Sequence, residues 1–519
     1  MAQEAAQAAK GTSVLMFQSV LTGFFRVLNL SLLTRLLLQE QMGQVAILGV
    51  IYGFLQFLGA AGLNHASPLF VPEQEAAGKL GRVKGFLKQS LGVVAASSSA
   101  IAVFILAAFP FFLGATTLSA DLLLLAIIVG PFSSLEVFLD SFLLARYEVK
   151  ELAAGRTLFN GVRLVGTVAL VFLGWDVVGV MLGWLLAEIV AVLVFGYAAV
   201  SGIDVKSKDV GMTSVLSFGL PSLAFQTIDV TIQNTDRIIL LQLTNLSALA
   251  VYDVFLRILF MFSLVSLTVS SATYPILTRI RVGLENTDEV HESGKSMGEV
   301  VTTLVRYILI LLFPAGAILA LNSHAFLQIL FGAQYANYPG ASLSFSILVF
   351  SYVVWGVVYG LHAVLRSMEE KMFFVVTGIA VIGLEIVGCW FLISWFGLLG
   401  CALIRCSYIF ILLLTSVGRL WQKGVRGFSS IAKPVVRITG SSLIAGLVTY
   451  FIAPPGLIGL ALIAVLSLGV YLLLLIISRE PRELDFRIAR SLLPSVLHWP
   501  INKVENILFE PEKSEEETA

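Results

Sequence analysis

Charged residues are scarce in this 519-residue sequence. Asp, Glu, Lys and Arg together make up 13% of it, whereas apolar residues make up 58% and the mean hydropathy is +0.92. A soluble protein carries roughly 25% charged residues. The scarcity therefore excludes an ordinary soluble domain and predicts a membrane protein. Because the formal net charge is zero, the composition also gives no electrostatic basis for binding nucleic acid.

Cysteines and catalytic motifs are nearly absent as well. The three cysteines, Cys389, Cys401 and Cys406, lie in late apolar segments without metal-ligand neighbours, and we interpret them as packing residues. No phosphate-binding loop, HExxH motif or Ser/His/Asp grouping occurs, and the loops are too short for a nucleotide-binding domain. We therefore expect no catalytic residues, no metal, no cofactor and no enzyme activity. The polar N-terminus also lacks the pattern of a cleavable signal peptide.

Long apolar runs dominate what is present. A membrane-spanning helix needs about 20 mostly apolar residues, and fourteen segments meet this requirement. The candidate spans are residues 12–38, 44–69, 86–114, 119–145, 157–174, 176–200, 212–242, 247–276, 298–321, 341–365, 372–394, 397–418, 438–453 and 456–478. We therefore predict an all-α polytopic membrane protein with about fourteen transmembrane helices.

The basic residues predict the orientation of these spans. Of the 33 Lys and Arg residues, 26 lie in the two terminal segments and in every second interval between spans, with Lys88 counted at the edge of span 86–114, and the other intervals contain none. Short loops rich in Lys and Arg remain in the cytoplasm, so we predict a multi-pass protein of the cell membrane with both termini cytoplasmic. In the longest outer interval, 322–340, Phe331, Tyr335 and Tyr338 are expected at the membrane–water boundary.

The chain also shows signs of duplication. Thr34-Arg35 and Asp236-Arg237 occupy matching places near the ends of the first and seventh spans. We predict a six-helix lobe over 1–200, a linker at 201–211 and a second six-helix lobe over 212–418. A basic linker with two extra helices (419–478) and a cytoplasmic amphipathic and acidic tail (479–519) follow. The alternative is chance similarity among Leu-rich helices.

Four stretches of sequence carry a family resemblance. They are FGLPSLAFQTIDVTIQNTDRIILLQL at 218–243, ALAVYDVFLRI at 248–258, FFRVLNLSLLTRLLLQEQMGQVAI at 24–47 and FGLLGCALIRCSY at 396–408. Through them the chain resembles, over nearly its whole length, the polysaccharide flippases of the multidrug/oligosaccharidyl-lipid/polysaccharide exporter superfamily. The resemblance implies two pseudo-symmetric lobes around a central cavity.

Individual positions match the family pattern unevenly. Family members typically carry a proline early in span 7, an Asp-Arg pair near its far end and a tyrosine in span 8. Pro221, Asp236-Arg237 and Tyr252 match these features. The first half departs from the usual Gly-x-Tyr at Gly43-Gln44-Val45. These diffuse motifs indicate the superfamily better than they indicate the substrate.

Seven basic residues remain inside the predicted spans, and all are arginines. They are Arg26, Arg35, Arg163, Arg237, Arg257, Arg306 and Arg405. An arginine at a helix centre costs about 2.5–3.5 kcal/mol on insertion scales, so it persists where it reaches the interface, pairs with a carboxylate or faces water. Its planar guanidinium also suits phosphate.

These arginines admit different roles. Arg26 and Arg257 are the candidates for a cavity that binds an anionic headgroup, although a structural role stays open for both. Arg35, Arg237 with Asp236, and Arg163 lie near span ends, which favours snorkelling or structural pairing over substrate contact. Arg306 and Arg405 lie deeper in their spans, and we expect them to pair with Glu385 in span 11 or with polar neighbours.

Span 7 is unusually polar for a lipid-facing helix. Asp229 lies in its middle, flanked by Gln226, Gln233 and Asn234. We predict that this face lines an aqueous cavity and that Asp229 binds a proton or Na⁺ to couple transport to a gradient. The alternative is that Asp229 pairs with an arginine from span 1 or span 8.

Together these features predict a flippase that moves a polyprenyl phosphate- or pyrophosphate-linked oligosaccharide from the cytoplasmic to the outer leaflet by alternating access. We expect it to act as a monomer, with membrane lipids and the lipid-linked sugar as its partners. The alternative is a cation-coupled multidrug or small-metabolite exporter of the same superfamily. A third possibility is a scaffold or glycosyltransferase, but the longest outer loop has no Asp or Glu to hold a metal.

Overall fold

Helices form almost all of the computed structural model of the chain. The structure describes residues 2–113, 118–201, 203, 205–285, 290–426, 431–452, 456–483, 485, 486, 490, 499, 502–506 and 508. No β-strand occurs among these residues, and the chain is an all-α polytopic membrane protein, as the sequence predicts. The acidic end from residue 509 onward lies outside the described residues.

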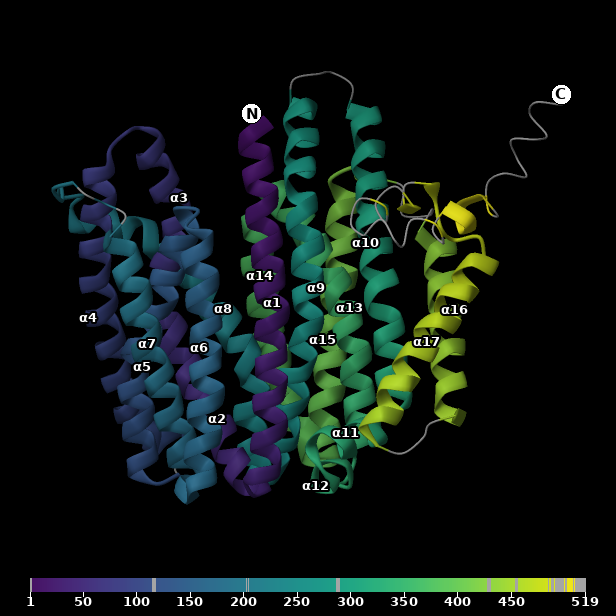
Figure 1. The fold of residues 1–519 in the computed structure, drawn as a ribbon, viewed down its shortest axis with the longest axis horizontal. Coiled ribbons are helices and arrows are strands. Elements are labelled where there is room, and N and C mark those ends of the chain that lie inside the picture. Colours follow the sequence, from purple (N-terminus) through teal and green to yellow (C-terminus); the bar gives the residue numbers. More distant parts are fainter. Residues whose placement is uncertain are drawn as a thin grey trace. The chain divides into compact units, whose positions relative to one another are not determined.

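The first of two compact units contains Met1–Ile258, Leu330–Ala341 and Met372–Ile404. Its helices are α1 (Ala2–Leu36), α2 (Gln39–Gly59), α3 (Leu63–Ala76), α4 (Leu80–Leu113), α5 (Ala120–Ala145), α6 (Val149–Leu170), η1 (Val171–Trp175), α7 (Asp176–Ser201), α8 (Met212–Leu243), the start of α9 (Leu246–Glu285), α12 (Ala333–Ala336) and nearly all of α14 (Lys371–Phe396). Figure 1 shows α4, α5, α6 and α7 running side by side, and α5 packs against each of the other three.

Aromatic stacking and close backbone approaches hold this unit together. Phe70 of α3 stacks on Phe86 of α4 with ring centroids 4.5 Å apart, inside an apolar core. Gly43 lets α2 approach α9, because a Cβ at this position would lie 2.2 Å from the carbonyl oxygen of Leu246. Since lipid tails are as apolar as these side chains, dense packing rather than the hydrophobic effect associates the helices.

A left-handed glycine divides the predicted span 44–69 into two helices. Gly62, between α2 and α3, has a φ of 72°, and a Cβ on it would lie 2.1 Å from the carbonyl oxygen of Gly219 in α8. Only glycine satisfies both the left-handed backbone and the close contact. The turn between α2 and α3 therefore lies directly against α8.

The second unit contains Leu259–Ile329, Ser342–Lys371 and Arg405–Ala519. Its helices are the rest of α9, α10 (Val290–Leu321), α11 (Ser323–Phe331), α13 (Ala341–Ser367), most of α15 (Leu398–Gln422), α16 (Ala432–Ile452) and α17 (Leu457–Ile477). α10 packs against α16 and α17. The Tyr471 hydroxyl of α17 donates to the carbonyl oxygen of Ile310 at 3.2 Å, which ties α17 to α10.

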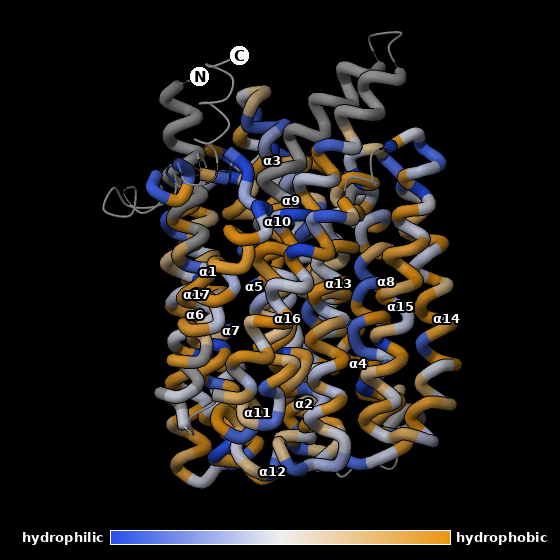
Figure 2. Tube along the Cα trace, turned by 90° about the vertical axis from the view of Figure 1, so that its right-hand side faces the viewer, coloured by the Kyte–Doolittle hydropathy of each residue, from blue (hydrophilic) through white to orange (hydrophobic). Residues whose placement is uncertain are grey.

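Ten segments of the described chain are long and apolar enough to cross a membrane. They cover eleven of the predicted spans, because Val149–Ser201 contains two of them, and α1, α16 and α17 are helices over the other three. Figure 2 shows apolar residues along most of the length of the helices. The count of fourteen crossings remains a prediction.

The division into two six-helix lobes at 201–211 also remains a prediction. The two compact units divide at other points of the chain, since the first unit extends through α8 to Ile258. Five helices begin in one unit and end in the other, namely α9, α11, α13, α14 and α15, although α13 and α14 cross at their first residue. The division between the units therefore falls within helices and not only within loops.

The expectation for the aromatic residues of the outer interval is wrong for two of them. Phe331 and Tyr335 are fully buried, so they pack inside protein and do not anchor the chain among lipid headgroups. Gln334 Nε2, between them, donates to the carbonyl oxygen of Thr34 at 3.0 Å. The Ser31 hydroxyl likewise donates to the carbonyl oxygen of Leu330 at 2.6 Å, so this segment is fastened to the end of α1.

Candidate functional site

Three arginines in long helices of the first unit retain unused hydrogen-bond donors. Arg26 lies on α1, Arg163 on α6 and Arg257 on α9. Helix α1 packs against α6, and the Thr167 hydroxyl of α6 donates to Asn29 Oδ1 of α1 at 3.0 Å. This contact brings Arg26 and Arg163 within electrostatic range of each other. Arg26 is exposed, and its guanidinium makes no hydrogen bond or ion pair with the described residues.

Aromatic rings hold the Arg163 guanidinium. Its Cζ lies 4.4 Å from the ring centroid of Trp184, 5.5 Å from that of Tyr52 and 5.9 Å from that of Phe159. Such cation–π contacts contribute about 0.5–2 kcal/mol each. Within the described part of the chain the guanidinium has no hydrogen-bond or ion-pair partner. The rings therefore orient Arg163 while its five N–H donors stay available.

Arg257 lies beside the same tryptophan. A Cβ built on Gly49 would be 3.1 Å from Arg257 Nη2 and 3.7 Å from Trp184 Cη2, so the missing side chain of Gly49 makes room for both groups. Arg257 Nε donates to Asp253 Oδ2 at 2.5 Å, and the side chain is 32% exposed. We call Arg26, Arg163 and Arg257 the arginine row. Trp184 and Gly49 connect its last two members.

One buried carboxylate serves two guanidinium groups at the end of this row. Asp253 is 3% exposed, accepts a hydrogen bond from Arg257 and forms an ion pair with Arg237 Nη2 at 3.2 Å. Arg237 Nη1 also donates to Asn234 Oδ1 at 2.9 Å. Asp236 is buried and accepts from the Tyr252 hydroxyl. Because Arg237 and Arg257 share the single carboxylate of Asp253, these three residues together carry a net positive charge. Arg237 is paired within the protein, which is the kind of role that its position near a span end favours.

Two buried glutamates lie near the other end of the row. The Tyr52 hydroxyl donates to Glu188 Oε1 at 2.5 Å, and Glu188 is fully buried. Its second oxygen, Oε2, has no hydrogen-bond partner in the described structure. Glu136 is 8% exposed, and the charge of Arg163 acts on both glutamates. An unsatisfied buried carboxylate oxygen is costly unless a proton or a cation meets it.

The polar residues of α8 divide into two groups. Gln226 is 5% exposed and donates to Asn64 Oδ1 of α3 at 3.0 Å, while Asn234 is 7% exposed and holds Arg237. Gln226 therefore joins α8 to α3, whereas Asn234 makes its hydrogen bonds within α8. Asp229 and Gln233 are exposed one turn apart on α8. The predicted cavity lining by this helix remains a prediction.

The remaining predicted residues have varied surroundings. Arg35 is exposed at the end of α1, and Glu385 is fully buried in α14. Arg405 is 4% exposed, and its Nη1 donates to the Tyr352 hydroxyl at 2.9 Å, which makes Tyr352 a polar neighbour of the expected kind. Within the described residues no group of three His, Cys, Asp or Glu residues has the geometry to hold a metal.

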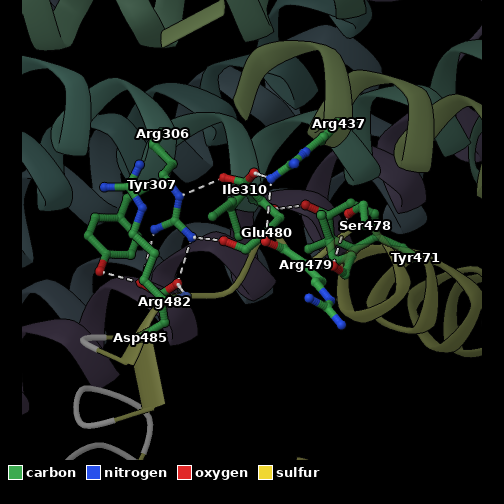
Figure 3. A network of polar contacts seen from close by, with 11 residues as sticks. Arg306, Tyr307, Ile310, Arg437, Tyr471, Ser478, Arg479, Glu480, Arg482 and Asp485 are labelled. Atoms are coloured by element: carbon green, nitrogen blue, oxygen red, sulfur yellow. Dashed lines mark hydrogen bonds and ion pairs between the residues drawn. The ribbon is translucent and has the colours of Figure 1, made fainter. Parts of the chain in front are cut away.

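Arg306 has partners that sequence reasoning did not identify. It binds Glu480 and Asp485, which follow α17, and not Glu385 (Figure 3). The only signal in the sequence is that these carboxylates come directly after the last apolar run. Sequence reasoning also missed Tyr52 and Trp184 as neighbours of Arg163, because α2, α6 and α7 meet only through the fold.

Solved structures of transporters share this fold. The lipid II flippase MurJ, in an inward closed conformation, matches with a TM-score of 0.67 and 14% identity, covering 90% of this chain and 99% of that one. An inward-facing multidrug resistance MATE family transporter matches with a TM-score of 0.62 and 13% identity (77% and 95% covered). A mutant of the Vibrio cholerae MATE transporter VcmN gives 0.58 and 14% (82% and 98%). At these identities the likeness concerns the fold alone.

Sequence comparison gives the family. No curated protein sequence matches the chain. The family profile described as "Polysaccharide biosynthesis protein" matches residues 32–339, which is more than half of the chain. The chain therefore belongs to the polysaccharide biosynthesis protein family.

Proposed function

We propose that this protein is a flippase for a lipid-linked oligosaccharide, which it moves from the cytoplasmic to the outer leaflet of the cell membrane. The arginine row carries the proposal. Each arginine in a membrane-spanning helix costs about 2.5–3.5 kcal/mol, yet Arg26 and Arg163 use none of their guanidinium donors on the described protein, and Arg257 uses only Nε. A phosphate or pyrophosphate group is the ligand that such unused, planar donors suit best.

The chemistry of the substrate fits this arrangement. A sugar pyrophosphate crosses hydrocarbon only if its charge is neutralised and its oxygens are hydrogen-bonded, while the polyprenyl tail can stay in the bilayer. The row supplies charge and N–H donors without any catalytic group, so the protein acts as a transporter and not as an enzyme. Alternating access around a site near the membrane midplane completes the cycle. We further propose a monomer with both termini in the cytoplasm, as the Lys and Arg distribution favours.

Family and fold support the same function. The profile that matches belongs to polysaccharide biosynthesis proteins, and a solved structure with this fold is named a lipid II flippase. Lipid II flippase activity belongs to that protein, and we extend to this chain only the substrate class of a lipid-linked sugar.

The experiment reconstitutes the protein in liposomes with a labelled polyprenyl pyrophosphate sugar in the inner or outer leaflet. We expect the protein to change the fraction of headgroup accessible to an added reagent. Arg26→Ala should lower the rate roughly tenfold or more, since a hydrogen bond to a charged group is worth about 1.5–3 kcal/mol. Arg35→Ala is the matched control, because Arg35 is an exposed arginine of the same helix. Unchanged headgroup accessibility with the wild-type protein would refute the flippase.

The buried Glu188 supports a coupling role for a proton or Na⁺. Its Oε2 lacks a hydrogen-bond partner among the described residues, and Tyr52 fixes the other oxygen. We expect Glu188→Gln to fold but to lose the response of transport to an imposed pH or Na⁺ gradient. Transport by Glu188→Gln that responds to either gradient as strongly as the wild type would exclude this residue.

A cation-coupled exporter is the second candidate, because the Tyr52–Glu188 pair is also suited to a drug antiporter with the MATE fold. The two functions separate in cells. Arg26→Ala should strongly reduce surface glycan if the protein is a flippase. Intact glycan with altered drug resistance would favour the exporter.

A further inference from the structure

A recess lined by basic residues lies at one end of the second unit, separate from the arginine row. It has a volume of about 420 Å³ and forms where α16 begins and α17 ends. Lys433 and Arg437 of α16 line it together with Arg479 and Arg482, which follow α17. All four side chains are exposed. The distribution of Lys and Arg assigns this end of the helices to the cytoplasmic membrane surface.

The recess is preformed, because α10 holds one of its walls. Arg306 Nε donates to Glu480 Oε1 at 2.9 Å, and its Nη2 donates to the Glu480 carbonyl oxygen at 2.9 Å and to Asp485 Oδ2 at 2.6 Å. The Tyr307 hydroxyl donates to the same Asp485 carboxylate at 2.7 Å. Figure 3 shows Arg306 and Arg437 meeting the carboxylate of Glu480 from two sides. The segment after α17 is thereby fixed on α10.

The C-terminal cap of α17 directs the following residues, including Glu480, toward α10. Arg479 has a φ of 52°, and the N–H groups of Arg479 and Glu480 donate to the carbonyl oxygens of Ile476 and Leu475. This is the Schellman arrangement, in which glycine usually occupies the left-handed position. An arginine held there has a fixed backbone, and its charge borders the recess.

Positive charge dominates the open face of the recess. Two carboxylates accompany the four basic side chains, but Glu480 is 4% exposed and already bound by Arg306. Glu483 is the only exposed carboxylate among the lining residues. The Arg437 side chain is 43% exposed, and its Nη1 contacts Glu480 Oε2 and the Arg479 carbonyl oxygen, each at 3.4 Å, so most of its donors remain available.

Apolar side chains border the basic ones. Val436, next to Arg437, is 71% exposed, and Ile477, two residues before Arg479, is 67% exposed. A ligand that contacts both the basic and the apolar side chains needs an anionic head and an apolar body. We propose that this recess binds the phosphate of an anionic membrane phospholipid, as a site distinct from the one for the transported substrate. A basic pocket at the cytoplasmic ends of membrane helices suits such a headgroup.

The test measures binding of a fluorescent short-chain phosphatidylglycerol to the full-length protein in neutral detergent, with phosphatidylcholine for comparison. We expect phosphatidylglycerol to bind more tightly, and Lys433→Gln combined with Arg437→Gln to weaken it roughly 10- to 30-fold. Arg426→Gln is the matched control, because Arg426 is an exposed arginine of the same unit outside the recess. Arg479→Gly is a second variant that removes a charge and leaves the left-handed cap intact.

Three results would overturn the proposal. The first is wild-type affinity in the double variant, and the second is an equal loss of affinity in Arg426→Gln. The third is full displacement of the lipid by millimolar inorganic phosphate, which would make the recess a site for free anions. Thermal unfolding of each variant, measured alongside, checks that the helices remain folded. Flippase activity is not a readout here, so failure of this proposal leaves the proposed function standing.

Discussion

Arg306 and Arg257 show two opposite treatments of an arginine in a predicted membrane span. Arg306 is 2% exposed, and its Nε and both Nη groups are bound by Glu480 and Asp485. Arg257 is 32% exposed, uses only its Nε, and shares its single carboxylate, Asp253, with Arg237. The protein therefore satisfies the guanidinium of Arg306 fully, whereas the guanidinium of Arg257 has N–H donors that make no hydrogen bond with the described residues.

The contrast separates arginines that the protein satisfies from arginines with unused donors, which position in the sequence does not do. Both residues are arginines inside apolar stretches and cost a similar amount to insert. Arg306 recovers that cost through carboxylates that only the folded tail supplies. Arg163, held by ring faces of Trp184 and Tyr52, resembles Arg257, because it too keeps its donors. Unused N–H donors among the described residues are therefore the criterion that marks the arginine row.

Removing Arg306 should have the largest effect. Arg306→Ala leaves Glu480 and Asp485 without their main partner, and breaking a buried ion pair in this way costs about 3–5 kcal/mol. We expect a clear fall in the thermal unfolding temperature in detergent and earlier protease cleavage after α17. Arg437→Ala is the control, since this half-exposed partner of Glu480 should cost at most about 1 kcal/mol. Equal losses in the two variants would erase the proposed difference.

Removing Arg257 should affect transport and leave stability nearly unchanged. Asp253 keeps its contact with Arg237 in Arg257→Ala, so no carboxylate is left unpaired. We expect headgroup translocation to fall roughly tenfold to a hundredfold, in line with the loss of a charge-assisted hydrogen bond. Arg257→Lys should recover only part of the rate, because an ammonium lacks the planar fork. A destabilised protein with a normal translocation rate per folded molecule would move Arg257 into the structural class.

Arg479→Gly should raise stability by about 1 kcal/mol. Glycine adopts the left-handed backbone at this position without the steric cost that other residues carry. The side chain is exposed and is not part of the Arg306 network, so no ion pair is lost. Thermal unfolding of the variant beside the wild type measures the change. A fall in the unfolding temperature would mean that the Arg479 charge stabilises the tail.

The smallest effect should come from pH changes between about 5 and 8. Burial raises the pKa of Asp485, but hydrogen bonds from Arg306, the Arg482 backbone and Tyr307 outweigh it and leave the pKa below its usual value. The stabilisation is therefore present above about pH 3.9, the unfolded value, and is lost as the pH falls through the lower folded value. The protection factors for amide hydrogen exchange in residues 479–483, taken relative to the intrinsic rate at each pH, should stay constant above pH 5. A loss of protection in this segment near pH 6 would contradict the expectation.

Much of the fold could be predicted from the chain alone. Apolar runs of sufficient length predict helices, and helices occur over every predicted span, from α1 to α17. The split at Gly62 could not be predicted, because the left-handed glycine becomes necessary only when the turn meets Gly219 in α8. The burial of Phe331 and Tyr335 was missed for a similar reason, since the segment that carries them is bonded to the distant helix α1 through Gln334 and Leu330.

The candidate site was only partly predictable. The cost of charge in hydrocarbon singles out Arg26 and Arg257 from the sequence. The same argument singles out Arg306, yet it cannot tell which arginine will be satisfied. Gln226 and Asn234 looked like lining residues, but they bond within and between helices. Several polar residues along a helix indicate that hydrogen-bond partners are needed. They do not indicate whether the protein or a ligand provides those partners.

The sequence by itself determined that this chain is a bundle of membrane-spanning helices with arginines retained inside the spans. Hydropathy and charge are properties of single residues, so the order of the residues in the sequence is enough to predict the spans. Only the tertiary structure decided which guanidiniums are neutralised. Arg306 meets Glu480 across 174 positions, and Tyr52 meets Glu188 across 136. Pairing energies depend on distances of a few ångströms, and only packing of the helices sets such distances.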